Sequence, residues 1–475
     1  HNEEKPWVVL DPVMISTSGH KLIQDDAKEA IIQSVFPHVD VVTPNKFEAE
    51  ELLGRTLSTP QDVERGAQEI IDMGVKAVLI KGGHSLAETK NGDGTATVGD
   101  AALDQDVNAT IGYAQDYFLS SEGPLTAGEE RICDGCRGVW LRSNRFDSTH
   151  THGTGCTLSS VIASALAIGH QQRSMTMGGS DNDSVIGAGA ARSIYMVDAC
   201  CLAKAYVTAG VAQGVQLGSG PGPVVQTTFP SSHAYFPEVA LDPTSASSGR
   251  FLAIKSATDA STSNDDAVTL GKLLPIVDNV EWMERLTKLD DITDIQLRIK
   301  GETDEEKIFA IVQKCQEICQ RDGVRLWIND FWIAAIRAKC FGVHVGQEDL
   351  TRCVNEGGLD ALKANDLALG ISTHSYAELS AAFGIKPSYI SLGPVFGTKS
   401  KNVAFDPQGL ATVRKWKTLI RPDVPLVVIG GINDAERTLS VKDAGADCVA
   451  VIGAVKKDDD ESVANAVRDL MDAME

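Results

Sequence analysis

The sequence lacks any apolar run of about 18 residues, the length that a helix needs to cross a membrane, so no membrane span is expected. It is also short of basic residues: 43 lysines and arginines face 65 aspartates and glutamates, giving a formal net charge of -22. Proteins that bind nucleic acid present basic stripes to the phosphates, so a nucleic-acid partner is not expected. Any anionic substrate must be held by local positive groups that oppose the overall charge.

The ten cysteines form no disulfide framework, which predicts a soluble protein of a reducing, intracellular compartment. Cys133 and Cys136 form one CxxC pair in a loop-like stretch, where incidental thiols are favoured because a metal site needs more ligands. The chain begins at His1 and a strand is expected already at Trp7–Leu10. We therefore expect a piece of a longer product, whose targeting segment, cytoplasmic or plastid, would lie upstream.

Residues 1–225 are predicted to form an α/β domain. Short β-branched runs such as Val39–Val42 and Ala77–Ile80 alternate with amphipathic stretches, which favours parallel strands between helices. Two stretches, at about 85–147 and 171–182, are rich in Gly, Ser, Asp and Thr and are interpreted as surface insertions.

Residues 226–270 have no sustained period and many Ser, Thr, Pro and Asp residues, which predicts a linker. From residue 271 to 475, eight short apolar runs alternate with helical patterns such as Glu305–Cys319. The runs are Leu273–Val277, Ile292–Ile299, Arg325–Ile328, Gly342–Gly346, Leu367–Ile371, Tyr389–Gly393, Leu426–Ile429 and Val449–Ile452. Eight strand–helix repeats predict a (β/α)8 TIM barrel.

Polar residues and glycines follow these runs, where a TIM barrel carries its chemistry. Arg298 and Lys300 lie two positions apart, so both point the same way and can neutralise phosphate oxygens. Lys401 is a third cation, and the carboxylates of Asp330 and Asp349 are suited to a Mg²⁺ that also binds substrate phosphates. The residues at run ends are Asp278, Gln296, Arg298, Lys300, Asn329, Asp330, Gln347, Glu348, Asp349, Ser372, Thr373, Thr398, Ser400, Lys401, Gly430, Gly431 and Gly453.

The glycines of this set predict a second anion site. Gly430-Gly431 and Gly453 follow the last two runs, and backbone N–H groups at these loops commonly bind phosphate in TIM barrels. The predicted site therefore holds two anions, one bridged by metal and one bound by backbone. Small-molecule phosphates are the expected partners, while the oligomeric state, including a homo-oligomer, stays open.

Several strings in this half resemble thiamine phosphate synthase in order and spacing. They are Gln296-Leu-Arg-Ile-Lys300, Ile328-Asn-Asp330, Gly342-Val-His-Val-Gly-Gln-Glu-Asp349, Gly370-Ile-Ser372, Gly393-Pro-Val-Phe396 with Thr398-Lys-Ser-Lys401, and Ile429-Gly-Gly-Ile432. The resemblance implies that hydroxymethylpyrimidine diphosphate and thiazole phosphate give thiamine phosphate and pyrophosphate.

The resemblance also implies roles. Asp330 and Asp349 would hold Mg²⁺. Gln296, Arg298, Lys300, Asn329, Ser372 and Lys401 would contact the pyrimidine diphosphate, with Lys401 also counted as catalytic. The thiazole phosphate would be contacted by Thr398 to Ser400, Gly431 and Ile452-Gly453. Gly397 stands where the family often has proline and Gly453 where serine is common, so weaker thiazole phosphate binding is expected.

Two alternatives stand beside this interpretation. The related thiazole tautomerase shares the barrel, and His374 after Ser372 is compatible with it, but it should lack a full set of diphosphate-binding residues. A non-enzymatic sensor or scaffold is the other alternative, and the complete polar set at the strand ends argues against it.

In the N-terminal half, His152-Gly-Thr-Gly-Cys156 precedes a helical stretch, Thr157–Ala167. Glycines that open a helix direct backbone N–H groups at an anion. The alternative is a tight loop before a buried helix, with Cys156 as a small core residue.

The context of this motif resembles hydroxymethylpyrimidine phosphate kinase, a ribokinase-like family. The resembling strings are Val8-Val-Leu-Asp-Pro-Val-Met14, Thr43-Pro-Asn-Lys-Phe-Glu48, Lys81-Gly-Gly-His84, His152–Cys156, Ala203-Lys-Ala-Tyr-Val207 and Gly220–Val224. The resemblance implies ATP as co-substrate, with Gly153 and Gly155 stabilising the transferring phosphoryl group and Cys156 in the base position. Asn45 and Glu48 would help organise Mg²⁺, and Lys81 would lie near the nucleotide.

The family's first strands and helices precede the position of Asp11 and are absent from this sequence. We therefore expect a kinase–synthase fusion whose kinase part, as given, is a poor kinase by itself.

Overall fold

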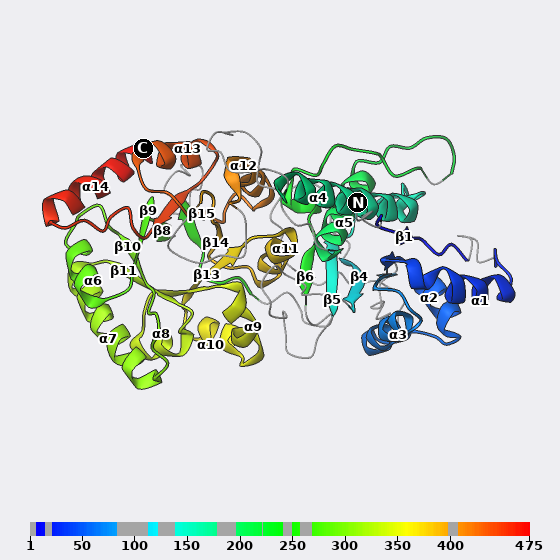
Figure 1. Ribbon diagram of the computed structural model, residues 1–475, viewed down its shortest axis with the longest axis horizontal. Helices are drawn as coiled ribbons and strands as arrows, with labels where there is room; N and C mark the ends of the chain where they lie inside the picture. Colours follow the sequence, from blue (N-terminus) through cyan, green and yellow to red (C-terminus); the bar gives the residue numbers. More distant parts are fainter. Residues whose placement is uncertain are drawn as a thin grey trace, which may run out of the picture. The chain divides into compact units, whose positions relative to one another are not determined.

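The computed structural model describes residues 6–14, 21–82, 113–121, 138–177, 196–220, 222–240, 249–256, 268–397 and 407–475. The chain divides into two compact units (Figure 1). The first lies entirely before residue 247, and the second contains the chain from Ser247 to Glu475.

A six-stranded sheet forms the centre of the first unit, in the order β1-β2-β3-β4-β5-β6. Its strands are β1 (Val9–Leu10), β2 (Val41–Val42), β3 (Ala77–Gly82), β4 (Tyr113–Ser120), β5 (Gly138–Asn144) and β6 (Glu238–Ala240). The first three strands are parallel, whereas β4, β5 and β6 each pair antiparallel with the preceding strand. The prediction of parallel strands holds only for the first three.

Two of these strands lie where the sequence suggested a surface insertion. β4 and β5 fall within residues 85–147, and both are core strands: Phe118 is 1% exposed and Leu141 is fully buried. That prediction was wrong for these residues, because the surrounding Gly- and Asp-rich sequence outweighed two short apolar segments. In the second proposed insertion, residues 171–177 are helical. Residues 85–112, 122–137 and 178–182 of the two stretches lie outside the described residues.

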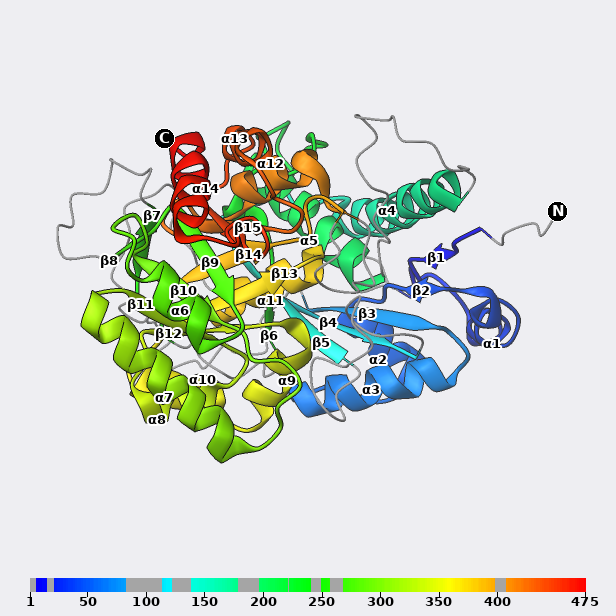
Figure 2. The ribbon, with the colours of Figure 1, turned by 60° about the vertical axis from the view of Figure 1, so that its left-hand side comes forward.

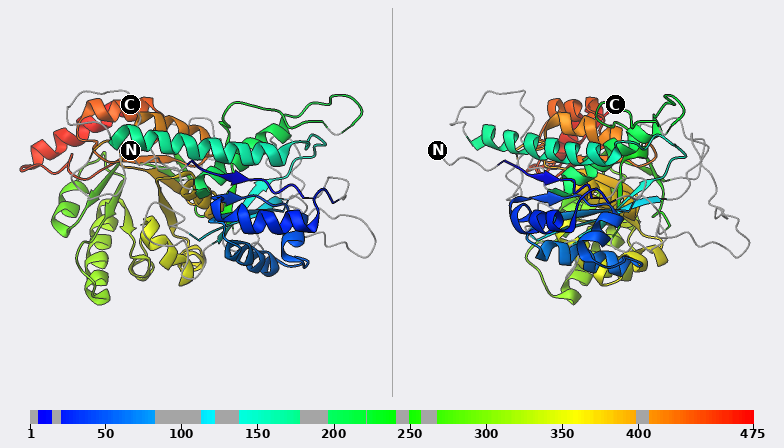
Figure 3. Two further views of the ribbon diagram at one scale, coloured as in Figure 1. Left: turned by 45° about the vertical axis from the view of Figure 1, so that its right-hand side comes forward. Right: turned by 90° about the vertical axis from the view of Figure 1, so that its right-hand side faces the viewer.

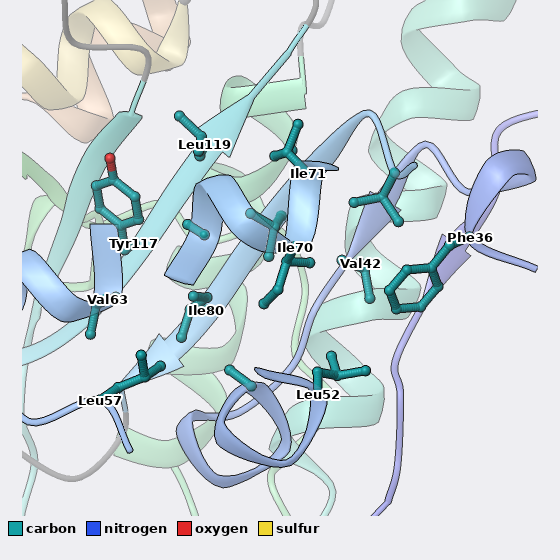
Figure 4. Packing of buried hydrophobic residues seen from close by; sticks show 14 of the residues in the cluster. Phe36, Val42, Leu52, Leu57, Val63, Ile70, Ile71, Ile80, Tyr117 and Leu119 are labelled. Carbon is teal, nitrogen blue, oxygen red and sulfur yellow. The ribbon is translucent and has the colours of Figure 1, made fainter. Parts of the chain in front are cut away.

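In the described part of this unit, five helices cover the sheet: α1 (Asp25–Ser34), α2 (Lys46–Leu53), α3 (Pro60–Asp72), α4 (Thr154–Met177) and α5 (Met196–Ala212). The short 3-10 helix η1 (Phe36–His38) follows α1. Val42, Ile80 and Leu119 point from neighbouring strands toward α2 and α3, where they form a buried cluster (Figure 4). Successive strand residues face opposite sides. The other face is left to α4 and α5, which pack on each other and on β1 and β5 (Figure 3).

The stretch predicted as a linker, residues 226–270, contains regular structure at both ends. The 3-10 helix η2 (His233–Tyr235) leads into β6 of the first sheet. β7 (Ile254–Ser256) and β8 (Val268–Leu270) form a separate parallel pair. Buried side chains of Ile254 and Leu270 join the core of the second unit, so this part of the stretch belongs to the folded unit.

The second unit is a closed barrel of eight parallel strands, in the order β10-β11-β12-β13-β14-β15-β16-β9 (Figure 2). The strands are β9 (Leu273–Val277), β10 (Asp294–Leu297), β11 (Arg325–Asn329), β12 (Gly342–Val345), β13 (Ala368–Thr373), β14 (Tyr389–Leu392), β15 (Leu426–Ile429) and β16 (Cys448–Val451). Each overlaps one of the eight apolar runs in the sequence, which confirms the predicted TIM barrel.

Helices follow the strands around the barrel. They are α6 (Val280–Leu286), α7 (Glu305–Asp322), α8 (Trp332–Ala338), α9 (Gln347–Asn355), α10 (Gly358–Ala364), α11 (Tyr376–Ile385), α12 (Gly409–Leu419), α13 (Ala435–Asp443) and α14 (Asp460–Ala473). Side chains of Asp304, Ser375 and Asp434 cap α7, α11 and α13 by accepting backbone N–H bonds. These caps end the loops that leave the carboxyl ends of the strands, where the candidate site lies.

Candidate active sites

A chain of polar contacts crosses the carboxyl ends of β10, β11 and β12. The amide of Gln296 donates to Asn329 Oδ1 at 2.9 Å, and the Asn329 amide donates to Asp330 Oδ2. The other Asp330 oxygen accepts the Gly346 N–H at 3.1 Å. Three residues predicted to bind substrate or metal are therefore brought together on neighbouring strands.

Asp330 has an unusual backbone conformation. Its φ is 65°, in the left-handed region that non-glycine residues rarely adopt, and its N–H donates to the His344 carbonyl at 2.8 Å. Strained residues of this kind concentrate at functional sites. Here the conformation directs the carboxylate to the loop that begins α9, whose first turn carries Asp349.

Asp349 is half-buried, and its carboxylate lies 3.6 Å from Arg352 one helical turn later. Asp330 and Asp349 offer the hard oxygen ligands that Mg²⁺ prefers, and substrate phosphates would complete the coordination. Within the described parts of the chain, no group of three or more His, Cys, Asp or Glu residues is placed to hold a metal by itself. The two carboxylates have the chemistry for a metal that binds together with its substrate.

Arg298 and Lys300 follow β10, and the Arg298 N–H donates to the Val277 carbonyl at 2.7 Å. Arg298 is partly buried and Lys300 is exposed. Beside β9, Lys456 donates to Asp278 at 2.9 Å. Burial works to raise the pKa of Asp278, but its hydrogen bond and charge interaction with Lys456, helped by Lys300, lower it overall. Positive side chains therefore lie near the carboxyl ends of both β9 and β10.

His344 was not singled out from the sequence, yet it occupies the middle of the site. It is buried, with Nε2 2.9 Å from Ser372 Oγ and Nδ1 2.8 Å from the Tyr389 hydroxyl. Burial, then the charge of Arg298 and the neighbouring His374, lowers the pKa of His344 to about 4. The ring is therefore neutral at physiological pH. Gln347 also reaches Ser372, donating to its carbonyl at 2.6 Å.

The double glycine after β15 is required by close packing. Gly430 and Gly431 have φ values of 104° and 68°. A Cβ on Gly431 would lie 2.6 Å from the Gly397 carbonyl oxygen and 2.7 Å from Phe396 Cβ. In contrast, a Cβ on Gly453 would meet no atom of the described residues within 4 Å.

Other predicted thiazole phosphate residues are only partly visible. Ile452 and Gly453 directly follow β16, at the same end of the barrel as the double glycine. Thr398, Ser400 and Lys401 lie outside the described residues, so the proposed roles of these three stay predictions.

In the first unit, Asp11, Lys81 and Gly155 come together from distant parts of the sequence. Lys81 Nζ donates to Asp11 Oδ1 at 2.8 Å. A Cβ on Gly155 would lie 3.2 Å from Lys81 Nζ and 3.3 Å from Asp11 Oδ2. Gly155 is in the first turn of α4, whose free N–H groups and dipole attract anions. Gly153, with φ of 85°, makes the turn before this helix, and Cys156 is exposed in its first turn.

Asn45 and Glu48 form hydrogen bonds with each other. The Asn45 side chain accepts the Glu48 N–H at 2.9 Å, and the Glu48 carboxylate accepts the Asn45 N–H at 2.7 Å. This capping box begins α2. Burial raises the pKa of Glu48, against hydrogen bonding and the positive charge of Lys81. The sequence did not reveal that Asp11 pairs with Lys81 beside Gly155, although Asp11 lies in a string that resembles the kinase.

Comparison with known proteins agrees with this division. The family model of thiamine monophosphate synthase matches residues 268–455, and that of phosphomethylpyrimidine kinase matches residues 1–110 and 120–178. Thiamine-phosphate synthase of Salmonella schwarzengrund is 42% identical over 194 residues, which make up 41% of this chain and 88% of that protein.

Two solved structures are also similar. Thiamine phosphate pyrophosphorylase from Pyrococcus furiosus has a TM-score of 0.37 and 27% identity, and the match covers 43% of this chain and 95% of that one. Phosphomethylpyrimidine kinase from Clostridium difficile has a TM-score of 0.21 and 31% identity, with 34% and 49% covered.

No helix among the described residues is both long and apolar enough to span a membrane. The similarity to the Salmonella synthase extends over nearly all of that protein, and the barrel half carries it. The chain belongs to the thiamine-phosphate synthase family and is an enzyme of thiamine biosynthesis that also carries a phosphomethylpyrimidine kinase part.

Proposed function

We propose that the barrel binds both substrates at the carboxyl ends of its strands, hydroxymethylpyrimidine diphosphate at β10–β13 and thiazole phosphate at β14–β16. In the reaction, the bond between the pyrimidine methylene carbon and the diphosphate oxygen breaks, and the thiazole nitrogen bonds to that carbon. Pyrophosphate leaves with the bonding electron pair. The protein has to neutralise the leaving group and position the nitrogen, so no protein nucleophile is required.

In this proposal, the pyrimidine diphosphate lies against Arg298 and Lys300, whose positive charges attract the negatively charged diphosphate. The linked amides of Gln296 and Asn329 would orient the pyrimidine ring, and Ser372 would add a hydrogen bond. The single observation that carries the proposal is the continuous contact chain from Gln296 to Asp330, which begins at the strand end that Arg298 and Lys300 follow, in a family of known chemistry.

Mg²⁺ would be held by Asp330 and Asp349 and would supply charge neutralisation of the departing pyrophosphate. Asp330 supports this role, because its strained backbone and the Gly346 N–H fix the direction of its carboxylate. Lys401 would add a further positive charge.

The thiazole phosphate would be bound by backbone N–H groups near Gly431 and Gly453, and Ile452, Thr398 and Ser400 would add further contacts. The packing of Gly431 on Phe396 and Gly397 supports a fixed loop at this point. The space around a Cβ position on Gly453, which no atom of the described residues approaches within 4 Å, supports room for a phosphate oxygen there.

For the first unit, we infer that the nucleotide phosphates of ATP bind at the start of α4, close to Gly153, Gly155 and Lys81. The ion pair of Lys81 with Asp11 next to Gly155 supports this, since the lysine is already held at the helix N-terminus. Cys156 in the first turn would be the base, and Asn45 and Glu48 would organise Mg²⁺ through their shared cap.

The barrel proposal is tested by measuring thiamine phosphate formation by the full chain with an Arg298→Ala variant. We expect product from the wild type, and a KM for the pyrimidine diphosphate raised roughly ten-fold or more in the variant, because a charged hydrogen bond is lost. Arg337→Ala is the matched control: Arg337 pairs with Glu306 on the helical surface and should leave KM unchanged. Equal kinetics in the two variants would contradict the assignment, and absence of product from the wild type would contradict the function.

A further inference from the structure

Three side chains connect the barrel core to the candidate site. Tyr389 on β14 lies 2.8 Å from His344 Nδ1 on β12, and His344 Nε2 lies 2.9 Å from Ser372 Oγ on β13. The rings of Tyr389 and His344 are stacked, with centroids 5.7 Å apart. The tyrosine passes over Gly370, where a Cβ would lie 2.1 Å from its ring. Glycine at this position therefore makes the contact between β14 and β12 feasible.

The direction of the first hydrogen bond follows from what Tyr389 can reach. Tyr389 is fully buried, and burial raises the pKa of its hydroxyl far above the ordinary value, so the group keeps its proton. Among the described residues, His344 Nδ1 is the acceptor found for this proton. Because an unsatisfied buried donor is costly, Tyr389 donates to Nδ1.

The direction of the second hydrogen bond follows from the first. A neutral imidazole carries one N–H, and if Nδ1 accepts, the hydrogen resides on Nε2. His344 then donates from Nε2 to Ser372 Oγ. The Ser372 hydroxyl hydrogen is left over and is available to a group outside this chain of contacts.

We propose that Tyr389, acting through His344, is a positioning residue that keeps the Ser372 hydroxyl a hydrogen-bond donor to an acceptor atom of the pyrimidine diphosphate. The proposal rests on the proposed function, because Ser372 is assigned to that substrate there. With the opposite tautomer, Ser372 would donate to His344 and offer the substrate only lone pairs. A diphosphate carries acceptor oxygens and no donors at neutral pH, so that arrangement would bind it poorly.

Nitrogen NMR of the full chain, labelled in its histidines, reads the tautomer without requiring activity. We expect the wild type to carry hydrogen on His344 Nε2 and the Tyr389→Phe variant to populate the Nδ1–H form, since the donor to Nδ1 is gone. Tyr376→Phe removes another barrel hydroxyl, from a ring that packs on Trp416, and should leave the His344 signal unchanged. A wild-type Nδ1–H form, or an unchanged spectrum in Tyr389→Phe, would overturn the proposal.

Kinetics then separates this role from a merely structural one. Ser372→Ala should raise the KM for the pyrimidine diphosphate roughly ten-fold, and Tyr389→Phe roughly three- to ten-fold, as expected for weakened hydrogen bonds to a charged group. In the Ser372→Ala background, Tyr389→Phe should have no further effect on KM, because the donor it controls is absent. Additive effects would overturn the proposal. If the wild type forms no thiamine phosphate, the proposed function fails, while the tautomer measurement still decides the hydrogen-bond direction.

Discussion

The conformation of the double glycine leads to a quantitative prediction for Gly431→Ala. A left-handed φ such as the 68° of Gly431 costs a residue with a side chain about 1–2 kcal/mol. The new carbon would also lie 2.6 Å from the Gly397 carbonyl oxygen, and forcing an extra carbon into packed structure costs about 1–3 kcal/mol. Together these effects predict a loss of about 2–5 kcal/mol in the unfolding free energy of the barrel.

Gly453→Ala is the matched control, because Gly453 lies at the same rim and a Cβ added there would have no atom of the described part of the chain within 4 Å. We expect its unfolding free energy to change by less than about 0.5 kcal/mol. Hydrogen exchange of amides in β14 and β15 measures the barrel separately from the first unit. Equal protection of these amides in the two variants would refute the packing argument for Gly431.

Three further predictions concern His344, Gly453 and Lys81. The pKa of His344 is about 4 in the folded state and 6.5 in the unfolded state, so between these pH values only the unfolded state binds the proton. The unfolding free energy should therefore fall by about 3 kcal/mol as the pH is lowered from 6.5 to 4. Hydrogen exchange across this pH range should show that slope in the wild type and lose it in His344→Gln; equal slopes would contradict the burial argument. Gly453→Ser should be accommodated and lower the KM for thiazole phosphate, measured by thiamine phosphate formation; an unchanged or higher KM would mean that no phosphate oxygen lies there. Lys81→Met should weaken ATP binding by calorimetry roughly ten-fold or more, through loss of a charged contact, while Lys76→Met, at the other end of β3, should not; equal affinities would remove Lys81 from the nucleotide site.

The barrel could be predicted from the sequence because its strands are buried on both faces and therefore form continuous apolar runs. The same reasoning failed for β4 and β5, whose apolar residues are surrounded by polar sequence. Their place in the sheet depends on antiparallel pairing, such as Leu79 with Phe118, between segments far apart along the chain. Such a pairing cannot be predicted from the local amino-acid composition.

The residues of the candidate site could also be predicted only in part from the sequence. Gln296, Asn329 and Asp330 could be found because each ends a strand, and strand ends meet at one rim. Tyr389 instead begins its strand and has the character of a core residue. It reaches His344 on β12 by passing over Gly370 of β13, the strand between them, and the sequence does not indicate this contact. For the double glycine, the sequence suggested phosphate binding, which stays a prediction, and not the packing of Gly431 on Phe396 and Gly397.

The central claim is that the barrel makes thiamine phosphate with a metal held by Asp330 and Asp349. The most direct test is to follow thiamine phosphate formation by the full chain, at varied Mg²⁺, in the wild type, Asp349→Asn and Asp360→Asn. Asp349 and Asp360 each lie in the first turn of a helix, α9 and α10, so the control removes a similar charge away from the site. We predict Mg²⁺-dependent product in the wild type and Asp360→Asn, and a strongly raised Mg²⁺ requirement in Asp349→Asn. Product formation with the same Mg²⁺ dependence in all three proteins would contradict the metal assignment, and no product in any of them would contradict the synthase.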